Sequence, residues 1–271
     1  MSVSININKT LGVAAGTSII APTDNFTNTY SISLDGIDAY VDCGTNGSIN
    51  FDNTDTFSFS LWVKRNTFTT SDVILSKMNP SGNRRGYFIN LSPNTSNKIV
   101  FMLRRDTSFT SQRIIVKSTT LINDSDWHHI AITYDGTSTI NSIKLYVDGQ
   151  RDALTEVSGG PIGSILSSGT TPTLIGALKP GTPPTLPAAT FLDEVAIFGS
   201  VLTDGGVSEG QTAGGQIADI YNSGVPNDLT SLSPISWWRF EEGSGTTAID
   251  SGTGGNNGTL INGTAYSTDV P

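Results

Sequence analysis

Cysteine and histidine are almost missing from this sequence, and so are long apolar runs. Cys43 is the only cysteine, so no disulfide can form within the chain. The two histidines, His128 and His129, are sequence neighbours, and this is too small a supply of nitrogen and sulfur ligands for a zinc site. No apolar run approaches the roughly 18 residues of a membrane span, and no charged segment followed by an apolar one opens the chain. We therefore expect a protein made in a cytoplasm, without a membrane partner.

Positive charge is also scarce. The 271 residues include 15 Lys and Arg against 24 Asp and Glu, which gives a formal net charge of −9. A nucleic-acid-binding surface needs clustered Lys and Arg, so this balance argues against a nucleic-acid partner. The same charge is compatible with bound cations and equally with plain solubility.

Short runs of alternating polarity dominate what is present. The run WHHIAITYDG, residues 127–136, places Ile130, Ile132 and Tyr134 on one face of a strand, and IKLYVDG, residues 143–149, repeats the pattern. Each run ends at Asp-Gly, which tolerates the positive φ of a tight turn. The two runs therefore predict a hairpin in an antiparallel sheet with one buried face.

Further short runs of this kind follow one another along the chain. In TFSFSLWVK, residues 56–64, Phe57, Phe59 and Leu61 share one face, and Trp62 lies on the other. Other strands are predicted at residues 30–41, 73–77, 86–91, 99–105, 113–117, 173–177, 190–198, 236–240 and 258–261, and one short helix at residues 215–222. Many strands with little helix between them predict an all-β fold, an antiparallel β-sandwich of the jelly-roll type with one short helix.

Several of these motifs resemble, in the expected order, those of laminin G-like, concanavalin A-like domains. WHHIAITYDG and IKLYVDGQ resemble the central hairpin of that family, and LDGIDAYVDCG resembles its opening strand pair. FLDEVAIFGSVLT and IADIYNSG resemble its closing strand and short helix. One segment is out of order: WWRFEEGSGTTAIDSGTGGNNGTL resembles the usual start of such a domain but stands near the C-terminus. Chain ends that lie close together make such a permutation feasible.

The resemblance implies three segments. These are an N-terminal arm or extension at residues 1–29, a laminin G-like β-sandwich at residues 30–226, and a C-terminal segment that completes the sandwich at residues 227–271. In that last segment, Trp237 and Trp238 should split between the two faces of a strand, with one of them in the core. The alternative is a truncated second copy, whose unpaired apolar strand would favour aggregation. For the arm, the alternative is a frayed terminus with one added edge strand.

Carboxylates in the pattern of a glycoside hydrolase are absent. Laminarinase-like relatives of this fold carry Glu-x-Asp-x-x-Glu on one strand, and their chemistry needs two carboxylates beside the sugar bond. Here Asp193 and Glu194 are adjacent, as are Glu241 and Glu242, so we expect the members of each pair to point to opposite faces. For the two histidines we expect one half-buried and one on the outer face. The sequence thus predicts a protein that is not an enzyme.

The resemblance also implies one structural Ca²⁺ near the closing strand, since laminin G-like and laminarinase-like sandwiches often hold one there. Ca²⁺ takes about six to eight oxygen ligands from carboxylates and carbonyls. Asp193 would supply the carboxylate, Glu242 and Gly243 would supply backbone carbonyls, and Asp35 is a weaker candidate. The alternative, in which Asp193 caps a turn without a metal, remains open.

Arginine pairs and tryptophans are the candidates for sugar contacts. The pairs Arg84-Arg85 and Arg104-Arg105 could form a basic patch for an acidic glycan, or they could be solvated strand ends, which the net negative charge favours. Trp62 and Trp127 are core residues or sugar-stacking platforms, and burial is the commoner fate of aromatic side chains.

A domain of this family without a signal peptide, with an arm-like start and the end YSTDVP, resembles domains appended to tailed-phage virion proteins. This assignment would explain together the cytoplasmic synthesis, the absence of disulfides and the lack of catalytic groups. We therefore predict a non-catalytic structural or adhesion module on the virion surface, as a capsid decoration or a tail or fibre protein. Its expected partners are other virion proteins held through the arm, a cell-surface glycan and further copies of itself. The alternatives are a glycan-binding receptor-recognition tip and a secreted, extracellular bacterial adhesin, and a glycoside hydrolase is disfavoured.

Overall fold

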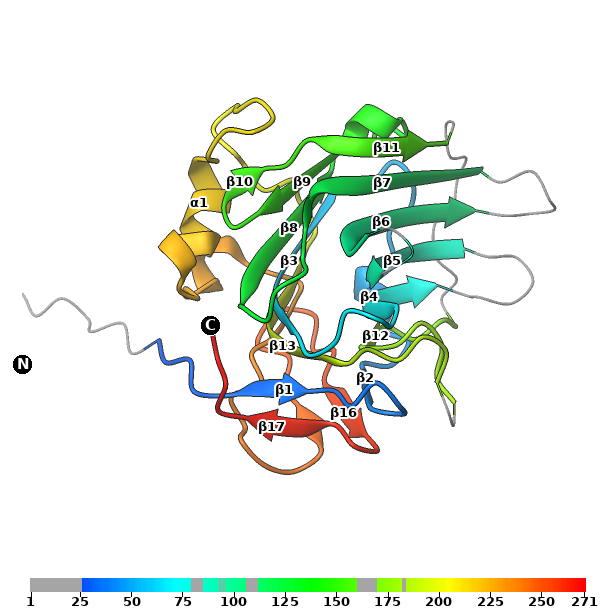
Figure 1. Cartoon of the computed structure of the whole chain (residues 1–271), viewed down its shortest axis with the longest axis vertical. Helices are drawn as coiled ribbons and strands as arrows, with labels where there is room; N and C mark the ends of the chain where they lie inside the picture. The colour runs from blue at the N-terminus through cyan, green and yellow to red at the C-terminus, as the bar shows by residue number, and fades with distance from the viewer. Residues whose placement is uncertain are drawn as a thin grey trace, which may run out of the picture.

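The alternating apolar runs form strands of two antiparallel sheets that lie face to face (Figure 1). The computed structural model of the chain describes residues 26–78, 85–92, 94, 96–105, 112–159, 170–181 and 184–271. Its architecture confirms the predicted all-β antiparallel β-sandwich of the jelly-roll type with one short helix. The predicted N-terminal arm lies mostly outside the described residues, which begin at Phe26.

The first sheet has eight strands and contains the predicted hairpin. Its order is β10-β9-β8-β3-β13-β1-β17, and β14 pairs with β13 beside this path. The strands are β1 (Ser31–Ser33), β3 (Phe57–Arg65), β8 (His128–Tyr134), β9 (Ile143–Val147), β10 (Gln150–Arg151), β13 (Thr190–Phe198), β14 (Ser236–Trp238) and β17 (Ala265–Ser267). Within the hairpin, Ile130 lies opposite Val147 and Ile132 lies opposite Leu145. These pairs bring the apolar faces of β8 and β9 onto one side of the sheet.

The second sheet has nine strands in the order β11-β7-β6-β5-β4-β12-β2-β16-β15. The strands are β2 (Tyr40–Asp42), β4 (Asp72–Met78), β5 (Arg85–Ser92), β6 (Lys98–Arg105), β7 (Gln112–Leu121), β11 (Leu154–Ser158), β12 (Leu174–Ile175), β15 (Thr247–Ala248) and β16 (Gly258–Ile261). β16 spans the residues predicted for it. β15 is a strand of only two residues, too short to show any alternation.

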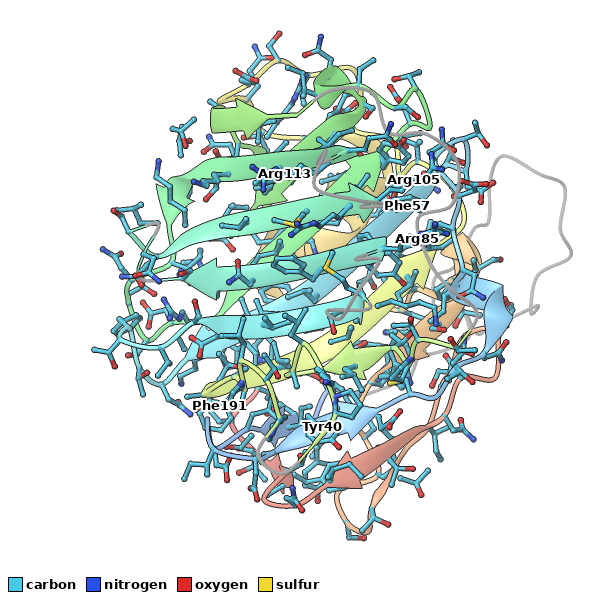
Figure 2. All side chains as sticks on the ribbon, turned by 90° about the vertical axis from the view of Figure 1, so that its right-hand side faces the viewer. Tyr40, Phe57, Arg85, Arg105, Arg113 and Phe191 are labelled. Atoms are coloured by element: carbon cyan, nitrogen blue, oxygen red, sulfur yellow. The ribbon has the colours of Figure 1, made fainter. Side chains whose placement is uncertain are left out.

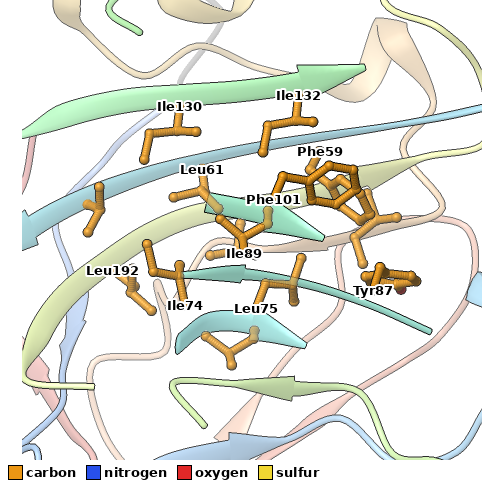
Figure 3. Packing of buried hydrophobic residues seen from close by; sticks show 14 of the residues in the cluster. Phe59, Leu61, Ile74, Leu75, Tyr87, Ile89, Phe101, Ile130, Ile132 and Leu192 are labelled. Carbon is orange, nitrogen blue, oxygen red and sulfur yellow. The ribbon is translucent and has the colours of Figure 1, made fainter. Parts of the chain in front are cut away.

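The main core fills the space between the sheets (Figure 3). From the eight-stranded sheet, Phe59, Leu61 and Ile132 point inward, and each is at most 1% exposed. From the nine-stranded sheet, Ile89 and Phe101 point toward them and are fully buried. Burial of each such side chain stabilises the fold by roughly 1.5–3 kcal/mol, so the alternation read from the sequence is the main source of stability.

A second apolar cluster covers the outer face of the eight-stranded sheet. It includes the helix α1 (Gly215–Tyr221), which buries Ile217 and Ile220 against Tyr146 and Phe198. The helix ends at Asn222, which has the left-handed conformation common at helix C-termini. Short 3₁₀ turns lie at Gly47–Ile49, Ile140–Ser142, Asn222–Gly224 and Thr230–Leu232. No described helix is long and apolar enough to cross a bilayer.

The C-terminal residues contribute strands to both sheets. β14 pairs with β13, β17 pairs with β1, and β16 pairs with β2. Trp238 belongs to the main core, whereas Trp237 belongs to the outer cluster beside α1. The two tryptophans therefore split between the faces of one strand, as the sequence predicted.

Candidate functional site

A β-bulge in β13 decides where the predicted calcium ligand lies. The pairing of β13 with β3 shifts from Asp193 opposite Trp62 to Ala196 opposite Ser60, so one extra residue is inserted in β13. Glu194 accordingly has a left-handed φ of +49°. Because of this insertion, Asp193 and Glu194 lie on the same outer side of the sheet. The prediction that adjacent acids here point to opposite faces is therefore wrong.

The segment that precedes β1 packs over these two carboxyl groups. The side-chain amide of Asn28 donates to Asp193 Oδ2 at 3.0 Å. The backbone N–H groups of Thr29 and Tyr30 both donate to Glu241 Oε1, at 2.8 and 3.0 Å. Asn28 Oδ1 is buried without a hydrogen-bond partner among the described residues. Asn28, Asp193 and Glu241, which are far apart in the sequence, thus belong to one partly buried polar cluster.

Two groups donate hydrogen bonds to the carboxyl group of Glu194. Its carboxyl group accepts hydrogen bonds from the indole N–H of Trp237 and from Arg239 Nε, the latter at 3.3 Å. Burial raises the pKa of Glu194 to about 8, although Arg239 and Trp237 act in the opposite direction. Burial, and the neighbouring charges of Glu194 and Glu241, also raise the pKa of Asp193 well above its usual value. The cluster therefore favours protonated carboxyl groups or a bound cation.

The predicted calcium ligands lie in different surroundings. Glu242 accepts hydrogen bonds from the N–H of Ile249 and the hydroxyl of Tyr266, at 2.8 and 3.1 Å. Gly243 packs against the ring of Tyr30, where a Cβ atom would lie 2.7 Å from it. Asp35 accepts three backbone N–H groups of its own turn. The structure thus places Glu241, and not Glu242, in hydrogen-bonding contact with the segment over Asp193.

The donor set around Asp193 suits a hard cation, because it consists of carboxylate and amide oxygens. Asp193 and Glu241 would hold Ca²⁺ together with the unpartnered oxygen of Asn28. Within the described part of the chain, no three Asp, Glu, His or Cys side chains are grouped to share a metal ion. Amide and carbonyl oxygens would therefore have to complete the coordination, and the calcium site stays a prediction.

The two histidines of the central hairpin have structural contacts. His128 lies between two carboxylates, with Nδ1 2.7 Å from Asp148 Oδ2 and Nε2 2.8 Å from Asp124 Oδ1. His129 is fully buried, and its Nε2 is 2.9 Å from the hydroxyl of Ser60. Burial lowers the pKa of His129 to about 4, so this ring is neutral at physiological pH. A buried neutral ring without access to solvent is poorly placed to act as a catalytic base.

The outer side of the nine-stranded sheet differs from that of its partner. α1 lies on the far side of the molecule from β4 to β7 (Figure 1). Strand register aligns Phe88 of β5, Met102 of β6 and Ile115 of β7 in one row on this outer side. All three side chains are partly exposed. We call this surface of β5, β6 and β7 the open face; Figure 2 looks onto this side of the sandwich.

A pocket adjoins the open face at the end of β4. Its volume is about 210 Å³, and its walls come from Met78, residues 170–172 and residues 178–180. Met78 pairs with Gly86, and Gly86 pairs with Arg104. Neighbouring strands are about 4.8 Å apart, so the pocket begins roughly 10 Å from the backbone of Arg104. The pocket therefore lies near the β5 edge of the open face.

Sequence reasoning did not find Asn28, Arg239 or the row on the open face. Asn28 lies in a segment with no periodic pattern, and its role depends on a partner 165 residues away. Arg239 stands two residues after Trp237 in the WWRF motif, so the sequence places both on one strand face. The sequence does not identify Glu194 as the partner of Arg239. The row of Phe88, Met102 and Ile115 was not recognised because alternation alone does not show which outer face is covered.

Comparisons with known proteins agree with this architecture. Among solved structures, the chain is similar to a candidate carbohydrate-binding protein from Bacteroides ovatus, with 15% identity and a TM-score of 0.59. That match covers 91% of this chain and 62% of the other protein, so this chain spans less than two thirds of its length. The chain is also similar to a heptameric pentraxin from Limulus polyphemus, with 14% identity, a TM-score of 0.47 and coverage of 65% and 78% of the two chains. The first of these matches, at 15% identity, shows a shared fold only.

Comparison of the sequence with known families identifies the family of this chain. No curated protein sequence matches the chain significantly. A family model described as the concanavalin A-like lectin/glucanases superfamily matches residues 35–208, which is well over half of the chain. The match includes the opening strand pair, the central hairpin and the closing strand whose geometry is described above. The chain therefore belongs to the concanavalin A-like lectin/glucanases superfamily.

Proposed function

We propose that this protein is a non-catalytic carbohydrate-binding module and that the open face with its adjoining pocket is the sugar site. The observation that carries the proposal is the partly exposed row of Phe88, Met102 and Ile115 beside the pocket. The outer face of the other sheet is covered by α1 and its apolar cluster. Among the described residues, the open face keeps partly exposed apolar side chains, and this is where we place the ligand.

The chemistry of this surface suits a saccharide. A pyranose ring has an apolar face of C–H groups and a polar rim, so it needs a flat apolar surface next to hydrogen-bonding groups. Phe88 and Met102 supply the apolar surface, and Asn90 lies two residues from Phe88 on the same face of β5. The pocket, at about 210 Å³, is smaller than the roughly 300–1,000 Å³ of typical ligand sites. It therefore suits one sugar unit of a longer chain that continues over the sheet.

The same surface supports binding without catalysis. Glycoside hydrolysis requires two carboxyl groups about 5–5.5 Å or 6.5–9.5 Å apart beside the sugar bond. β5, β6 and β7 contain no Asp or Glu. The same-side pair Asp193 and Glu194 belongs to the other sheet, where the two residues are 0% and 3% exposed beneath the segment that precedes β1. A sugar on the open face would therefore not contact these two carboxyl groups.

A glycan array followed by calorimetry tests the proposal. We expect the wild type to bind a defined set of oligosaccharides, and Phe88→Ala and Met102→Ala to lower the affinity at least about tenfold, because each removes apolar contact area. Ile37→Ala is the matched control, since Ile37 is a 68% exposed apolar residue outside the open face. The proposal fails if no glycan binds, or if all three variants bind as the wild type does.

We further propose that the module is displayed on a virion surface and attached by its N-terminal residues. What supports this is the docking of residues 26–30, where Phe26 stacks on Trp237 with ring centroids 6.3 Å apart and Arg239 binds the carbonyl of Thr27. These contacts set the position from which residues 1–25 connect to the sandwich. The alternative, an extracellular adhesin or receptor-recognition tip, uses the same sugar site but needs no particle.

Deletion of residues 1–25 distinguishes display on a virion from an extracellular adhesin or receptor-recognition tip. On a virion, the shortened protein should no longer copurify with particles, while its glycan affinity stays unchanged. A cryo-EM map of the particle should then show residues 1–29 of the full chain against a neighbouring virion protein. Copurification of the shortened protein at wild-type level would contradict attachment through these residues.

A further inference from the structure

The residues that follow β17 lie against the outer side of the eight-stranded sheet. Residues 268–271, which we call the tail, belong to no strand or helix. Figure 1 shows the chain leaving β17 and running past β1 toward the lower end of β8. The tail therefore covers part of a sheet to which it contributes no strand.

Three side chains of that sheet form a patch beneath the tail. Lys64 of β3 lies opposite Phe191 of β13, so the two side chains share a face. Their strand neighbours Val63 and Leu192 point into the core, so Lys64 and Phe191 point outward. Trp127 directly precedes β8, and its ring centroid lies 6.4 Å from that of Phe191. We call Lys64, Trp127 and Phe191, all partly exposed, the tail-binding patch.

The cover supplied by α1 stops short of this patch. Trp62, two residues before Lys64 on the same face of β3, stacks on Tyr221 of α1 with ring centroids 6.1 Å apart. The apolar cluster around the helix includes none of the three patch residues. The tail thus takes over where the helix ends.

One residue of the tail makes the polar contacts with the patch. Asp269 Oδ1 accepts a hydrogen bond from Trp127 Nε1 at 2.9 Å, and Asp269 Oδ2 accepts one from Lys64 Nζ at 2.7 Å. The backbone carbonyl of Asp269 accepts a third from the hydroxyl of Ser31, at 2.6 Å. Burial acts in the opposite direction, but the bonds from Lys64 and Trp127 hold the pKa of Asp269 below its usual value. The patch therefore recognises an ionised aspartate together with its peptide backbone.

The tail is held at the surface and not within the core. The side chains of Lys64 and Asp269 are 23% and 37% exposed, and ion pairs this accessible to water contribute little to stability. Thr268 is exposed, and Val270 and Pro271 are half-buried. The core residues between the sheets keep their contacts when the tail leaves. Detachment of the tail therefore does not require the sandwich to unfold.

We infer that the tail-binding patch is a docking site between copies of this chain, and that it accepts the tail of a second copy in place of its own. The chemistry that fits the patch is an aspartate in an irregular peptide, and a second copy supplies it in identical form. Exchange of an identical element costs little, because every contact of the closed form is made again. The inference goes beyond the proposed sugar binding and does not depend on it.

Geometry and mass action set the conditions for this exchange. Four extended residues span at most about 14 Å, so exchange brings the patches of two copies close together. The tail of the same chain has an effective concentration in roughly the millimolar range, as for short flexible connections. A second copy therefore competes when copies are crowded together, and a chain with an empty patch should accept the foreign tail much more readily.

A peptide tests recognition by the patch. The probe is a peptide of residues 267–271, STDVP, acetylated and amidated so that it carries no terminal charge, and its control is STNVP. The full-length variant Asp269→Ala should bind STDVP at least about tenfold more tightly than STNVP, because the charged contact is lost in the second peptide. The wild type should bind STDVP at least about tenfold more weakly than Asp269→Ala does, since its own tail occupies the patch. The NMR signal of the Trp127 indole N–H reports binding at the patch.

Mixing of two full-length variants tests docking between copies. Lys64→Gln keeps the tail but lacks one donor of the patch, whereas Asp269→Ala keeps the patch but lacks the carboxylate. In analytical ultracentrifugation, the mixture should associate at least about tenfold more strongly than either variant alone. Lys98→Gln, on the other sheet, and exposed Asp219→Ala are the matched controls, and their mixture should behave as the wild type does. Trp127→Phe, which keeps a ring and loses the N–H donor, should replace Lys64→Gln with the same result, and thermal melting shows whether each variant is folded.

Each failure would be specific. Equal binding of STDVP and STNVP to Asp269→Ala would overturn recognition of the aspartate. A mixture that stays monomeric, although STDVP binds, would show that the tail does not reach a second copy and would overturn the inference. Association of either variant alone as strong as that of the mixture would place the contact elsewhere, again against it. None of these outcomes bears on the sugar site, which Phe88→Ala and Met102→Ala test separately.

Discussion

His128, which lies in the family motif of the central hairpin, has a structural role. It connects the loop residue Asp124 to Asp148, which directly follows the second strand of the central hairpin. Asp148 also accepts the backbone N–H of His129 at 2.8 Å, so its carboxylate binds two neighbouring residues of β8. The hydrogen bond with Asp148, supported by that with Asp124, raises the pKa of His128 to about 9. The imidazolium form is therefore the one that the fold stabilises.

We expect His128→Gln to destabilise the protein in a pH-dependent way. A histidine with a raised pKa contributes stability that is present in full below the unfolded value of about 6.5 and is lost as pH rises through about 9. Loss of the charged contacts should lower the free energy of unfolding by about 1.5–3 kcal/mol at pH 6 and by much less at pH 10. Denaturant unfolding measures this difference, with exposed Asp126→Asn as the control. An effect of equal size at both pH values would contradict the role of the charge.

The paired carboxyl groups of Asp193 and Glu194 are the other residue-scale feature. A protonated Glu194 satisfies Trp237 and still lies beside Asp193, whereas two ionised groups would repel each other in a buried site. Glu241 adds a third negative charge nearby, and Arg239 supplies the compensating positive one. Protonation and cation binding are therefore competing ways to relieve the same repulsion.

Glu194→Gln tests the protonation of this cluster. The folded pKa of about 8 lies above the usual 4.5, so the folded state keeps a proton that the unfolded chain has lost, and the free energy of unfolding falls as pH rises between these values. Between pH 5 and 8, the free energy of unfolding should therefore decrease less for the variant than for the wild type. We expect the difference to be at least about 1.4 kcal/mol, the equivalent of one pKa unit. Glu209→Gln, at an exposed glutamate, is the control. Parallel stability curves for wild type and Glu194→Gln would refute the shift.

Calcium removal tests the second way of relieving the repulsion. A bound ion stabilises the folded state by about 2.7 kcal/mol at a hundredfold excess over Kd, so EDTA should lower the Tm of the wild type. Asp193→Ala should melt lower from the start and respond little to EDTA. Asp35→Ala, which removes the weaker candidate, should keep the wild-type response. If EDTA leaves the wild-type Tm unchanged, or lowers that of Asp193→Ala equally, the site is elsewhere or absent.

Among the elements, the C-terminal strands pair in both sheets. β14 and β17 pair within one sheet and β16 pairs within the other. Beyond β17, Asp269 accepts hydrogen bonds from Trp127 Nε1 at 2.9 Å and from Lys64 Nζ at 2.7 Å. These contacts connect the last residues of the chain to β3 and to the start of the central hairpin.

Truncation after Asn227 should therefore abolish cooperative folding. It removes Trp237, Trp238 and Phe240, which are at most 3% exposed. At roughly 1.5–3 kcal/mol each, their loss matches most of the stability of an ordinary domain, about 5–15 kcal/mol. We expect an insoluble or molten product by near-UV circular dichroism and calorimetry, whereas removal of Val270 and Pro271 alone should have a small effect. An unchanged melting transition for the long truncation would show that these residues are an independent appendage.

At the scale of the whole molecule, the outer faces of the two sheets differ in the residues that they carry. α1 and the residues around it cover the eight-stranded sheet, where they bury Trp237, Phe198 and Ile217. The open face carries its partly exposed apolar row. Under the proposed function, this asymmetry would direct a sugar ligand to one side of the sandwich.

The same asymmetry predicts that the protein binds sugars without cleaving them. Incubation with β-glucans, agar-type polymers and host surface glycans should release no reducing ends, because the strands of the open face carry no carboxyl group. A known glucanase assayed in parallel confirms that the substrates are competent. Turnover that disappears when one acidic residue is replaced by its amide would contradict this prediction.

Local pattern determined a large part of this protein. Alternation in residues 57–63 and 130–134 identified the inward faces of β3 and β8, and both faces are buried in the structure. The short helix and β16 were also predicted, and the order of motifs gave the family. These features depend on residues close together in the sequence, because period, turn chemistry and helix termination are set within a few residues.

Tertiary structure alone decided the site. The bulge that turns Asp193 and Glu194 to one side arises from pairing with β3, more than a hundred residues earlier. Register between separate strands brings Arg104 opposite Arg113, and the packing of α1 determines which outer face stays open. A single sequence does not specify these features through its periodicity, because they depend on which distant segments become neighbours. Alternation assigns a side chain to one face of a strand, but only long-range pairing determines which segments pack against that face.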